Sequence, residues 1–283
     1  MNTNIIEERL KRYNANSAET ELTALREITQ ELILFALSTS DFFSQAAFQG
    51  GTCLRIVHGL KRFSEDMDFI LTTSKRTFSW QQYLQLIGAM LEQYGYSVEL
   101  QDKSRADDAV KKAFIKDDSI AKVLKLAYAN RQGTQRKVRI KLEIDTNPPG
   151  SGEFESAFIG FPAPSSITTE TLPTLFAGKS HALLCRKYEK GRDWYDFLWY
   201  LGNKIPVNYN RLRAALDQTG PWAGRGLAVD RAWYIKEMSS RIADIDWKLA
   251  KEDIAPFISP EEQVLLSKWS IDFFLTALNT LSC

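Results

Sequence analysis

The chain has 283 residues, of which 44% are hydrophobic, so it can bury a sizeable core, and two domains are expected. Its 36 Lys and Arg nearly balance its 35 Asp and Glu, so any polynucleotide contact must come from a local patch rather than from overall charge. Three distant cysteines and two histidines argue against a disulfide framework, a zinc signature and a histidine-rich metal site. With no signal-peptide pattern and no apolar run of membrane-spanning length, we expect a cytoplasmic protein without a membrane partner.

The first half of the chain predicts alternating helices and strands. The stretch that starts at Ser17 begins a periodic apolar stripe that is typical of an amphipathic helix. In chain order we expect helix 17–37, strand 46–48, helix 52–57, strand 66–71, helix 80–94 and strand 96–100. The charged stretch 102–118 has few apolar residues and is expected to be a long, mobile loop. Strands 120–128 and 137–145 are then expected to pair around a turn that contains Gly133.

The second half begins with a change of composition. Residues 146–178 are rich in Pro, Gly, Ser and Thr, which is typical of a linker or an extended crossover. After Thr171 the pattern is helical, over 175–188, 192–201, 209–216, 230–249 and 260–281, and most of the tryptophans there are expected to be core residues: Trp222, Trp233, Trp247 and Trp269. The fold class is therefore an α/β domain over residues 1–165 followed by a helical C-terminal domain over 166–283.

A glycine turn stands at the start of the second predicted helix. Gly50 and Gly51 follow a short strand, and Thr52 opens the helix. Backbone N–H groups at a helix start attract anions, and the missing Cβ atoms let phosphate oxygens approach. The Thr52 hydroxyl can add a donor. Gly-Gly pairs usually mark ordinary turns, so the interpretation as a phosphate site depends on this position.

Two carboxylates, Asp66 and Asp68, stand one residue apart in the next predicted strand. The period of two places both on one face, opposite Met67, Phe69 and Leu71. Their mutual repulsion is about 4 kcal/mol at an effective dielectric near 20, which a cation would relieve. Hard oxygen ligands suit Mg²⁺ or Mn²⁺, with phosphates completing the shell. The alternative is a solvent-exposed strand face, although Asp is disfavoured in strands. Glycine turn and acid pair together indicate a nucleoside-triphosphate site with a divalent metal.

A third carboxylate would help to hold a second metal. Lys141, Glu143 and Asp145 share one face of the predicted strand 137–145, and the apolar residues between them face the core. Glu143 is preferred because it lies mid-strand, and Asp145 is the competitor. An exposed, salt-bridged face with Lys141 is the other interpretation.

Cations and acids gather again late in the chain. Lys179 and Arg186 are seven residues apart and share a helix face, while Arg192, Asp193 and Asp196 fall in the next helix. Lys as a point charge and Arg as a fork can bind a triphosphate tail. By spacing alone, however, ordinary ion pairs on a helix surface are favoured.

These segments resemble the AbiEii family of nucleotidyltransferases, the toxins of abortive-infection toxin–antitoxin pairs. The likeness runs from about Leu22 to Leu201 in motif order. It rests on a Gly-Gly-Thr-x-Leu-Arg turn at Gly50 to Arg55, an Arg-x-Ser-x-Asp-x-Asp-Phe strand at Arg62 to Phe69, and the late motif of Lys179, Arg186, Arg192, Asp193 and Asp196. Beyond about Gly202 no similarity is recognised.

The resemblance implies a polymerase-β-like mixed sheet with Mg²⁺ held by Asp66 and Asp68. It implies that Lys179 and one of Asp193 or Asp196 are required for activity. It places the triphosphate against a set of small, hydroxyl and basic residues, namely Gly50, Gly51, Thr52, Arg55, Ser64, Arg186 and Arg192.

The expected function is metal-dependent transfer of a nucleoside monophosphate from an NTP to an acceptor hydroxyl, the 3′ end of tRNA in some relatives, with an antitoxin as the cognate partner. Lys179 would stabilise the leaving pyrophosphate. Basic residues that could grip RNA, or belong to a solvated loop, are Lys103, Arg105, Lys111, Lys112, Arg131, Arg136 and Lys137. The alternatives are the same chemistry on a protein or a small molecule such as an antibiotic, and a nucleotide-binding regulator without turnover.

Overall fold

The computed structural model describes residues 3–105, 108–117, 119–120, 124 and 138–282. These form two compact units. The first comprises Met1–Gly59, Phe63–Pro148 and Glu155–Thr169, and the second comprises Leu60–Arg62, Pro149–Phe154 and Glu170–Cys283. Short pieces of early chain thus belong to the second unit. The single boundary after residue 165 stays a prediction.

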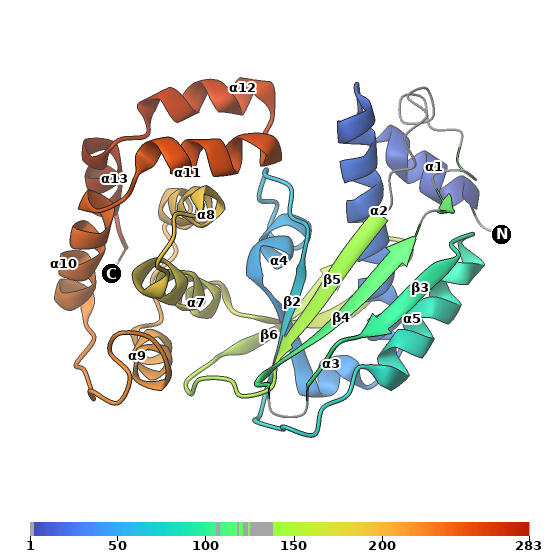
Figure 1. The fold of residues 1–283 in the computed structure, drawn as a ribbon, viewed down its shortest axis with the longest axis horizontal. Helices are drawn as coiled ribbons and strands as arrows, with labels where there is room; N and C mark the ends of the chain where they lie inside the picture. Colours follow the sequence, from blue (N-terminus) through green and yellow to red (C-terminus); the bar gives the residue numbers. More distant parts are fainter. Residues whose placement is uncertain (1–2, 106–107, 118, 121–123, 125–137, 283) are drawn as a thin grey trace. The chain divides into compact units, whose positions relative to one another are not determined.

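The first unit is built on a mixed sheet, of which Figure 1 labels strands β2 to β6. Among the described residues the sheet has seven strands, in the order β3-β4-β5-β2-β1-β7-β6. Strand β1 is antiparallel to β2 and parallel to β7, and β2 is parallel to β5. The strands are β1 Ala46–Gln49, β2 Met67–Leu71, β3 Val98–Asp102, β4 Val110–Asp117, β5 Val138–Asp145, β6 Phe154–Ile159 and β7 Ser165–Glu170. The mixed α/β fold expected from the sequence is confirmed.

Helices of the first unit are α1 Thr3–Lys11, α2 Ala18–Ser38, α3 Phe42–Gln45, α4 Gly50–Ile56 and α5 Gln81–Gln93. Helix α2 begins where the sequence predicted, and Ser17 caps it: the Ser17 hydroxyl accepts from the Thr20 N–H, and the Thr20 side chain accepts from the Ser17 N–H. Helix α2 contacts both α5 and strand β5, and the side chains of its apolar stripe are buried.

An aromatic cluster fixes the central strands of this sheet. The Phe69 ring lies 5.1 Å from Phe42, 5.3 Å from Phe48 and 5.9 Å from Trp80, measured between centroids. Phe48 and Phe69 are register partners in β1 and β2. A slip of one residue would turn these rings to the opposite face. The cluster therefore holds the register that places Asp68.

The prediction of a long loop over 102–118 was wrong, because this stretch contains strand β4. The side chains that β4 buries are Lys111, Ala113, Ile115 and Asp117, so two of four inward positions are charged and the apolar alternation is hidden. Lys111 donates to the Arg105 carbonyl, and Asp117 accepts from the Ile120 N–H at 2.9 Å.

The strand predicted over 137–145 is present as β5. Strand β5 pairs with β4 and β2. The expected partner 120–128 and the turn at Gly133 lie almost wholly outside the described residues.

The predicted linker 146–178 also contains strands, β6 and β7. Strand β7 lies parallel to β1, with Phe48 opposite Thr169. Its buried side chains are Ile167, Thr169 and Glu170, of which a single one is apolar. Composition therefore resembled a linker, although β7 is part of the sheet.

The second unit is helical, as predicted for the chain after Thr171. Its α-helices are α7 Leu172–Cys185, α8 Gly191–Gly202, α9 Tyr209–Gln218, α10 Arg231–Ala243, α11 Trp247–Ile254, α12 Pro260–Gln263 and α13 Ile271–Leu278, with short 3₁₀ helices at Ala255–Phe257 and Val264–Lys268. The helix expected over 230–249 is divided, because Asp246 caps α11 by accepting from the N–H groups of Lys248 and Leu249.

Aromatic residues form the core of this unit. The Phe274 ring stacks on Trp247 at 4.1 Å and lies 5.5 Å from Trp194 and 5.2 Å from Trp269. Trp247 and Trp269 are therefore core residues, as expected. Trp222 and Trp233 are half-buried and pack on each other at 5.6 Å.

Helices α8 and α11 approach very closely at Gly191. A Cβ there would stand 1.8 Å from the Ala250 carbonyl oxygen, so the position requires glycine. No helix in the described parts of the chain combines the length and apolar character needed to cross a membrane.

Candidate functional site

The glycine turn and the acid pair lie against each other in the first unit. Gly50 follows β1 and has φ +77°, in the left-handed region that favours glycine. A Cβ at Gly50 would stand 2.5 Å from Asp68 Oδ2 and 3.1 Å from Asp68 Cβ. Position 50 thus requires glycine for two reasons: its backbone is left-handed, and a larger side chain would collide with Asp68.

Thr52 connects the same two segments. It is fully buried, and its hydroxyl donates to the main-chain carbonyl of Asp66. This donor, which the sequence offered to a phosphate, therefore joins α4 to the chain entering β2. Gly51, beside it, is also buried.

The acid pair stands where β2 begins. Asp66 immediately precedes the strand and Asp68 is its second residue, and both are half-buried. Met67 and Phe69 are at most 1% exposed, so burial alternates as the period of two predicted. Two carboxylates thus share the half-exposed side of this strand entrance.

A row of polar residues crosses the sheet at Asp68. In register, Gln49 of β1 faces Asp68, Asp68 faces Glu143 of β5, and Glu143 faces Lys112 of β4. Glu143 accepts from Lys141 at 2.6 Å, and the Lys112 ammonium lies 3.5 Å from its other oxygen. Glu143 is therefore next to Asp68 in the sheet and is engaged by two lysines.

The third carboxylate stays a prediction. Among the residues described, no group of three or more His, Cys, Asp or Glu side chains is arranged to hold a metal ion. Asp145 ends β5, accepts from the Asn147 N–H at 2.8 Å and is in register with Ile70, two residues beyond Asp68.

Three nearby carboxylates, those of Glu143, Asp66 and Asp68, stabilise the charge of Lys141. Partial burial alone would lower its pKa, but the hydrogen bond and charge of Glu143, together with the charges of Asp66 and Asp68, raise the pKa of Lys141. Its ammonium therefore remains charged beside these carboxylates and offsets part of their repulsion.

Arg55 and Ser64, both expected to contact the triphosphate, are engaged by α2. The Arg55 Nε donates to Glu27 at 2.8 Å, and its guanidinium lies 4.4 Å from the Phe63 ring centroid. The Ser64 carbonyl accepts from Gln30 at 3.2 Å.

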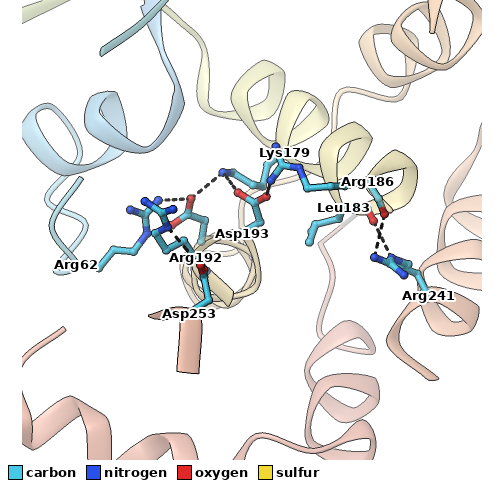
Figure 2. Close-up of polar contacts among 9 residues, drawn as sticks. Arg62, Lys179, Leu183, Arg186, Arg192, Asp193, Arg241 and Asp253 are labelled. Atoms are coloured by element: carbon cyan, nitrogen blue, oxygen red, sulfur yellow. Dashed lines mark hydrogen bonds and ion pairs between the residues drawn. The ribbon is translucent and has the colours of Figure 1, made fainter. Parts of the chain in front are cut away.

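The late motif forms a buried ion cluster in the second unit (Figure 2). Lys179 of α7 lies 2.7 Å from Asp193 and 2.9 Å from Asp196, both on α8. Arg186 pairs with the second oxygen of Asp193. The side chains of Asp193 and Asp196 are 4% and 0% exposed, so the predicted alternative of surface ion pairs does not hold.

Arg62 completes this cluster, and spacing arguments missed it. Its guanidinium donates two parallel bonds of 2.6 Å to both oxygens of Asp196. Its side chain is 3% exposed. Arg62 was visible as part of the strand motif, but no local spacing could pair it with a residue 134 positions away.

The charges in the cluster determine each other's ionisation. Burial would raise the pKa of Asp193, but Lys179, Arg186 and Lys190 lower it to about 2. Burial opposes the charge of Lys179, yet Asp193 and Asp196 raise the pKa of its ammonium. Asp193 and Lys179 are therefore both charged at neutral pH, and removing one of them would leave a buried charge uncompensated.

Arg192 contacts a different part of the unit. Its Nε lies 3.7 Å from Asp253 Oδ2, and its guanidinium lies 4.2 Å from the Phe257 ring (Figure 2 shows the Asp253 contact). In the structure it joins α8 to α11 and the 3₁₀ turn after it, and the triphosphate role that the resemblance implied for it stays a prediction.

The basic residues proposed to grip RNA divide into three groups. Lys111 is buried, so it is not available on the surface. Lys103 lies 5.6 Å from the Phe114 ring and Lys112 is half-exposed beside Glu143. Arg105 contributes its main-chain carbonyl, which accepts from the Lys111 ammonium. Three further basic residues lie outside the described residues, namely Arg131, Arg136 and Lys137.

Comparisons with known proteins agree with the motifs. The family model for the nucleotidyl transferase AbiEii toxin of type IV toxin–antitoxin systems matches residues 32–277. The fold is similar to MenT4, a nucleotidyltransferase toxin from Mycobacterium tuberculosis, with a TM-score of 0.53, 15% identity and coverage of 100% of both chains. It is also similar to JHP933 from Helicobacter pylori, with a TM-score of 0.50, 17% identity and coverage of 91% of this chain and 93% of that one. No curated protein sequence matches significantly.

Proposed function

Because the chain belongs to the AbiEii family of nucleotidyltransferase toxins of type IV toxin–antitoxin systems, we propose that it transfers a nucleoside monophosphate from an NTP to the 3′ end of tRNA. In this proposal, Asp66 and Asp68 hold a divalent Mg²⁺ or Mn²⁺. The observation that carries it is the contact between Asp68 and Gly50, which brings a carboxylate to a turn suited to phosphate.

The donor set of the acid pair fits such an ion. Two half-buried carboxylates supply hard oxygen ligands and leave other positions to water and phosphate, which is the usual environment of Mg²⁺ in nucleotide enzymes. When bound, the ion would neutralise negative charge on the phosphates and favour the deprotonated acceptor hydroxyl. Glu143 remains the preferred third carboxylate and Asp145 the competitor.

The proposed reaction is an in-line displacement. The acceptor hydroxyl oxygen forms a bond to the α-phosphorus, the bond from that phosphorus to the bridging oxygen breaks, pyrophosphate leaves, and the hydroxyl proton passes to water. Asp66 and Asp68 would hold the ion to which the triphosphate binds, while the Gly50 turn allows the triphosphate to approach closely. Catalysis of this kind comes mainly from positioning and electrostatics.

For Lys179 we propose that its charge stabilises the leaving pyrophosphate. Two buried carboxylates hold its ammonium, so it is charged and fixed in position within its own unit. Asp193 and Asp196 then act through Lys179, and this supports the requirement for one of them that the resemblance implied.

The experiment that tests the proposal is NTP labelling with an Asp68→Ala variant. Purified protein is incubated with total RNA or total protein and each radioactive NTP in turn, which also separates a tRNA acceptor from a protein acceptor. The wild type should label tRNA, and Asp68→Ala should lose at least about 10³-fold in rate while keeping its melting temperature.

The matched control is Asp102→Ala, which removes an exposed carboxylate at the end of edge strand β3. It should label RNA like the wild type. An Asp68→Ala protein that still labels RNA would refute the site. NTP binding without pyrophosphate release by the wild type would instead favour the regulator.

A further inference from the structure

The three residues that precede strand β2, the last of which is Asp66, are held by hydrogen bonds from side chains rather than by strand pairing. Strand β2 begins at Met67, so Ser64, Glu65 and Asp66 precede it. The carbonyls of Ser64 and Glu65 accept from the Gln30 amide nitrogen at 3.2 and 2.9 Å. The Asp66 carbonyl accepts from the Thr52 hydroxyl. Three successive carbonyl oxygens thus have side-chain donors.

Gln30 is placed rigidly for this task. It belongs to α2 and is 1% exposed. Helix α2 is capped at Ser17 and packs on α5 and β5, so Gln30 has a fixed base. Arg26, one turn earlier, adds an ion pair of 3.2 Å to the Glu65 side chain. Helix α2 therefore fastens this segment at two levels, one buried and one half-exposed.

We propose that Gln30 is a positioning residue for Asp66 and, through it, for the divalent ion; this rests on the proposed function. Asp68 is fixed by strand pairing with Gln49 and Glu143, whereas Asp66 lies before the strand. The separation of the two carboxylates therefore depends on the segment that Gln30 and Thr52 hold. An error of about 1 Å in such an arrangement can cost about 10²-fold in rate.

The chemistry of the position selects an amide. A neutral amide nitrogen carries two hydrogens and can serve two carbonyls, whereas a carboxylate donates nothing and would add negative charge near Asp66. Residue 30 lies just before the range 32–277 that the family model matches. Its role is thus read from these hydrogen bonds and not from a family motif.

The test compares Gln30→Met with Thr29→Val. Methionine keeps the side-chain length without the donors. Thr29 is an equally buried neighbour whose hydroxyl bonds to the Leu25 carbonyl at 2.8 Å and the Tyr96 hydroxyl at 2.9 Å, away from residues 64–66. Both variants lose buried hydrogen bonds, so both should lose some stability.

The readouts are Mn²⁺ binding, measured as free ion by electron paramagnetic resonance, and the Mn²⁺ concentration for half-maximal RNA labelling. Gln30→Met should weaken Mn²⁺ binding about tenfold, because the segment that carries Asp66 would have to be ordered when the ion binds, and should raise the half-maximal concentration similarly. Thr29→Val should bind Mn²⁺ like the wild type.

Unchanged Mn²⁺ binding by Gln30→Met would overturn the inference. If Gln30→Met fails to fold, Gln30→Asn, which keeps the amide on a shorter stem, is measured by the same criterion, and unchanged binding again overturns it. Asp66→Ala separates the two claims. If that variant binds Mn²⁺ like the wild type, the proposed metal site itself fails; if it loses binding while Gln30→Met does not, this inference alone fails.

Discussion

The chain contains two pairs of aspartates whose surroundings are opposite. Asp66 and Asp68 are half-buried at a strand entrance, next to a glycine turn. Asp193 and Asp196 are buried on a helix, with Arg62, Lys179 and Arg186 paired to them. The first pair concentrates negative charge, whereas the second has its charge compensated within the protein. Two aspartate pairs of one chain therefore have different physical roles.

The difference predicts opposite effects on stability when each pair loses a charge. Repulsion between the two carboxylates of the first pair opposes folding, so removal of one of these charges should not lower the free energy of unfolding. Loss of a carboxylate from the second pair leaves buried cations uncompensated. Three measurements, from the largest expected effect to the smallest, test this contrast.

Asp196→Asn should lower the free energy of unfolding by about 3–5 kcal/mol, because Arg62 and Lys179 would lose a buried charged partner. Asp68→Asn should leave it unchanged or raise it. Urea unfolding followed by tryptophan fluorescence measures both. Asp253→Asn is the control, since its half-exposed contact with Arg192 at 3.7 Å should contribute less than about 1 kcal/mol. An equal loss in Asp68→Asn and Asp196→Asn would remove the contrast.

Acid should weaken the second unit through Asp193. Its folded-state pKa is lowered from 3.8 to about 2, so its contribution is complete above about pH 4 and is lost as the pH falls toward 2. The shift corresponds to about 2 kcal/mol. Urea unfolding of wild type and Asp193→Asn from pH 6 to pH 2 should show the two stabilities converging below pH 4. A constant difference down to pH 2 would contradict the assigned cause.

Gly50→Ala should separate stability from activity. Alanine at φ +77° costs about 1–2 kcal/mol, and its Cβ would stand 2.5 Å from Asp68 Oδ2. Because Asp68 must move, RNA labelling should fall by about 10²-fold, more than the stability loss explains. Gly59→Ala is the control, since it has φ +74° and no atom within 4 Å of the added Cβ. Equal activity of the two variants would show that the Asp68 contact is unimportant.

The sequence predicted elements wherever one periodic signal dominated. Helix α2 begins after Ser17 as expected, and the strand with Asp68 buries Met67, Phe69 and Leu71 as predicted. Prediction failed where buried positions carry polar groups, as at Lys111 and Asp117 of β4 and Thr169 of β7. Their partners lie elsewhere in the fold, so no local pattern could indicate that these positions are inside.

The candidate site shows the same limit. Spacing indicated the acid pair and the glycine turn, but it favoured surface ion pairs for Lys179 and Asp193 and gave no partner for Arg62. Gln30 had no signal at all, because it acts on carbonyls 34 and 35 positions away. Long-range hydrogen bonds of this kind exist only once the chain is folded.

Arg241 of the C-terminal helices stabilises the end of helix α7. From α10 it donates to the carbonyls of Leu183 and Arg186, both at 3.0 Å, where α7 ends (Figure 2). Helix ends need partners for their last carbonyls, and here the partner comes from 55 residues further along the chain. A truncation that removes α10 and the residues after it would therefore fray the C-terminal end of α7, the helix that carries Lys179. A minimal version of this protein must retain these C-terminal residues.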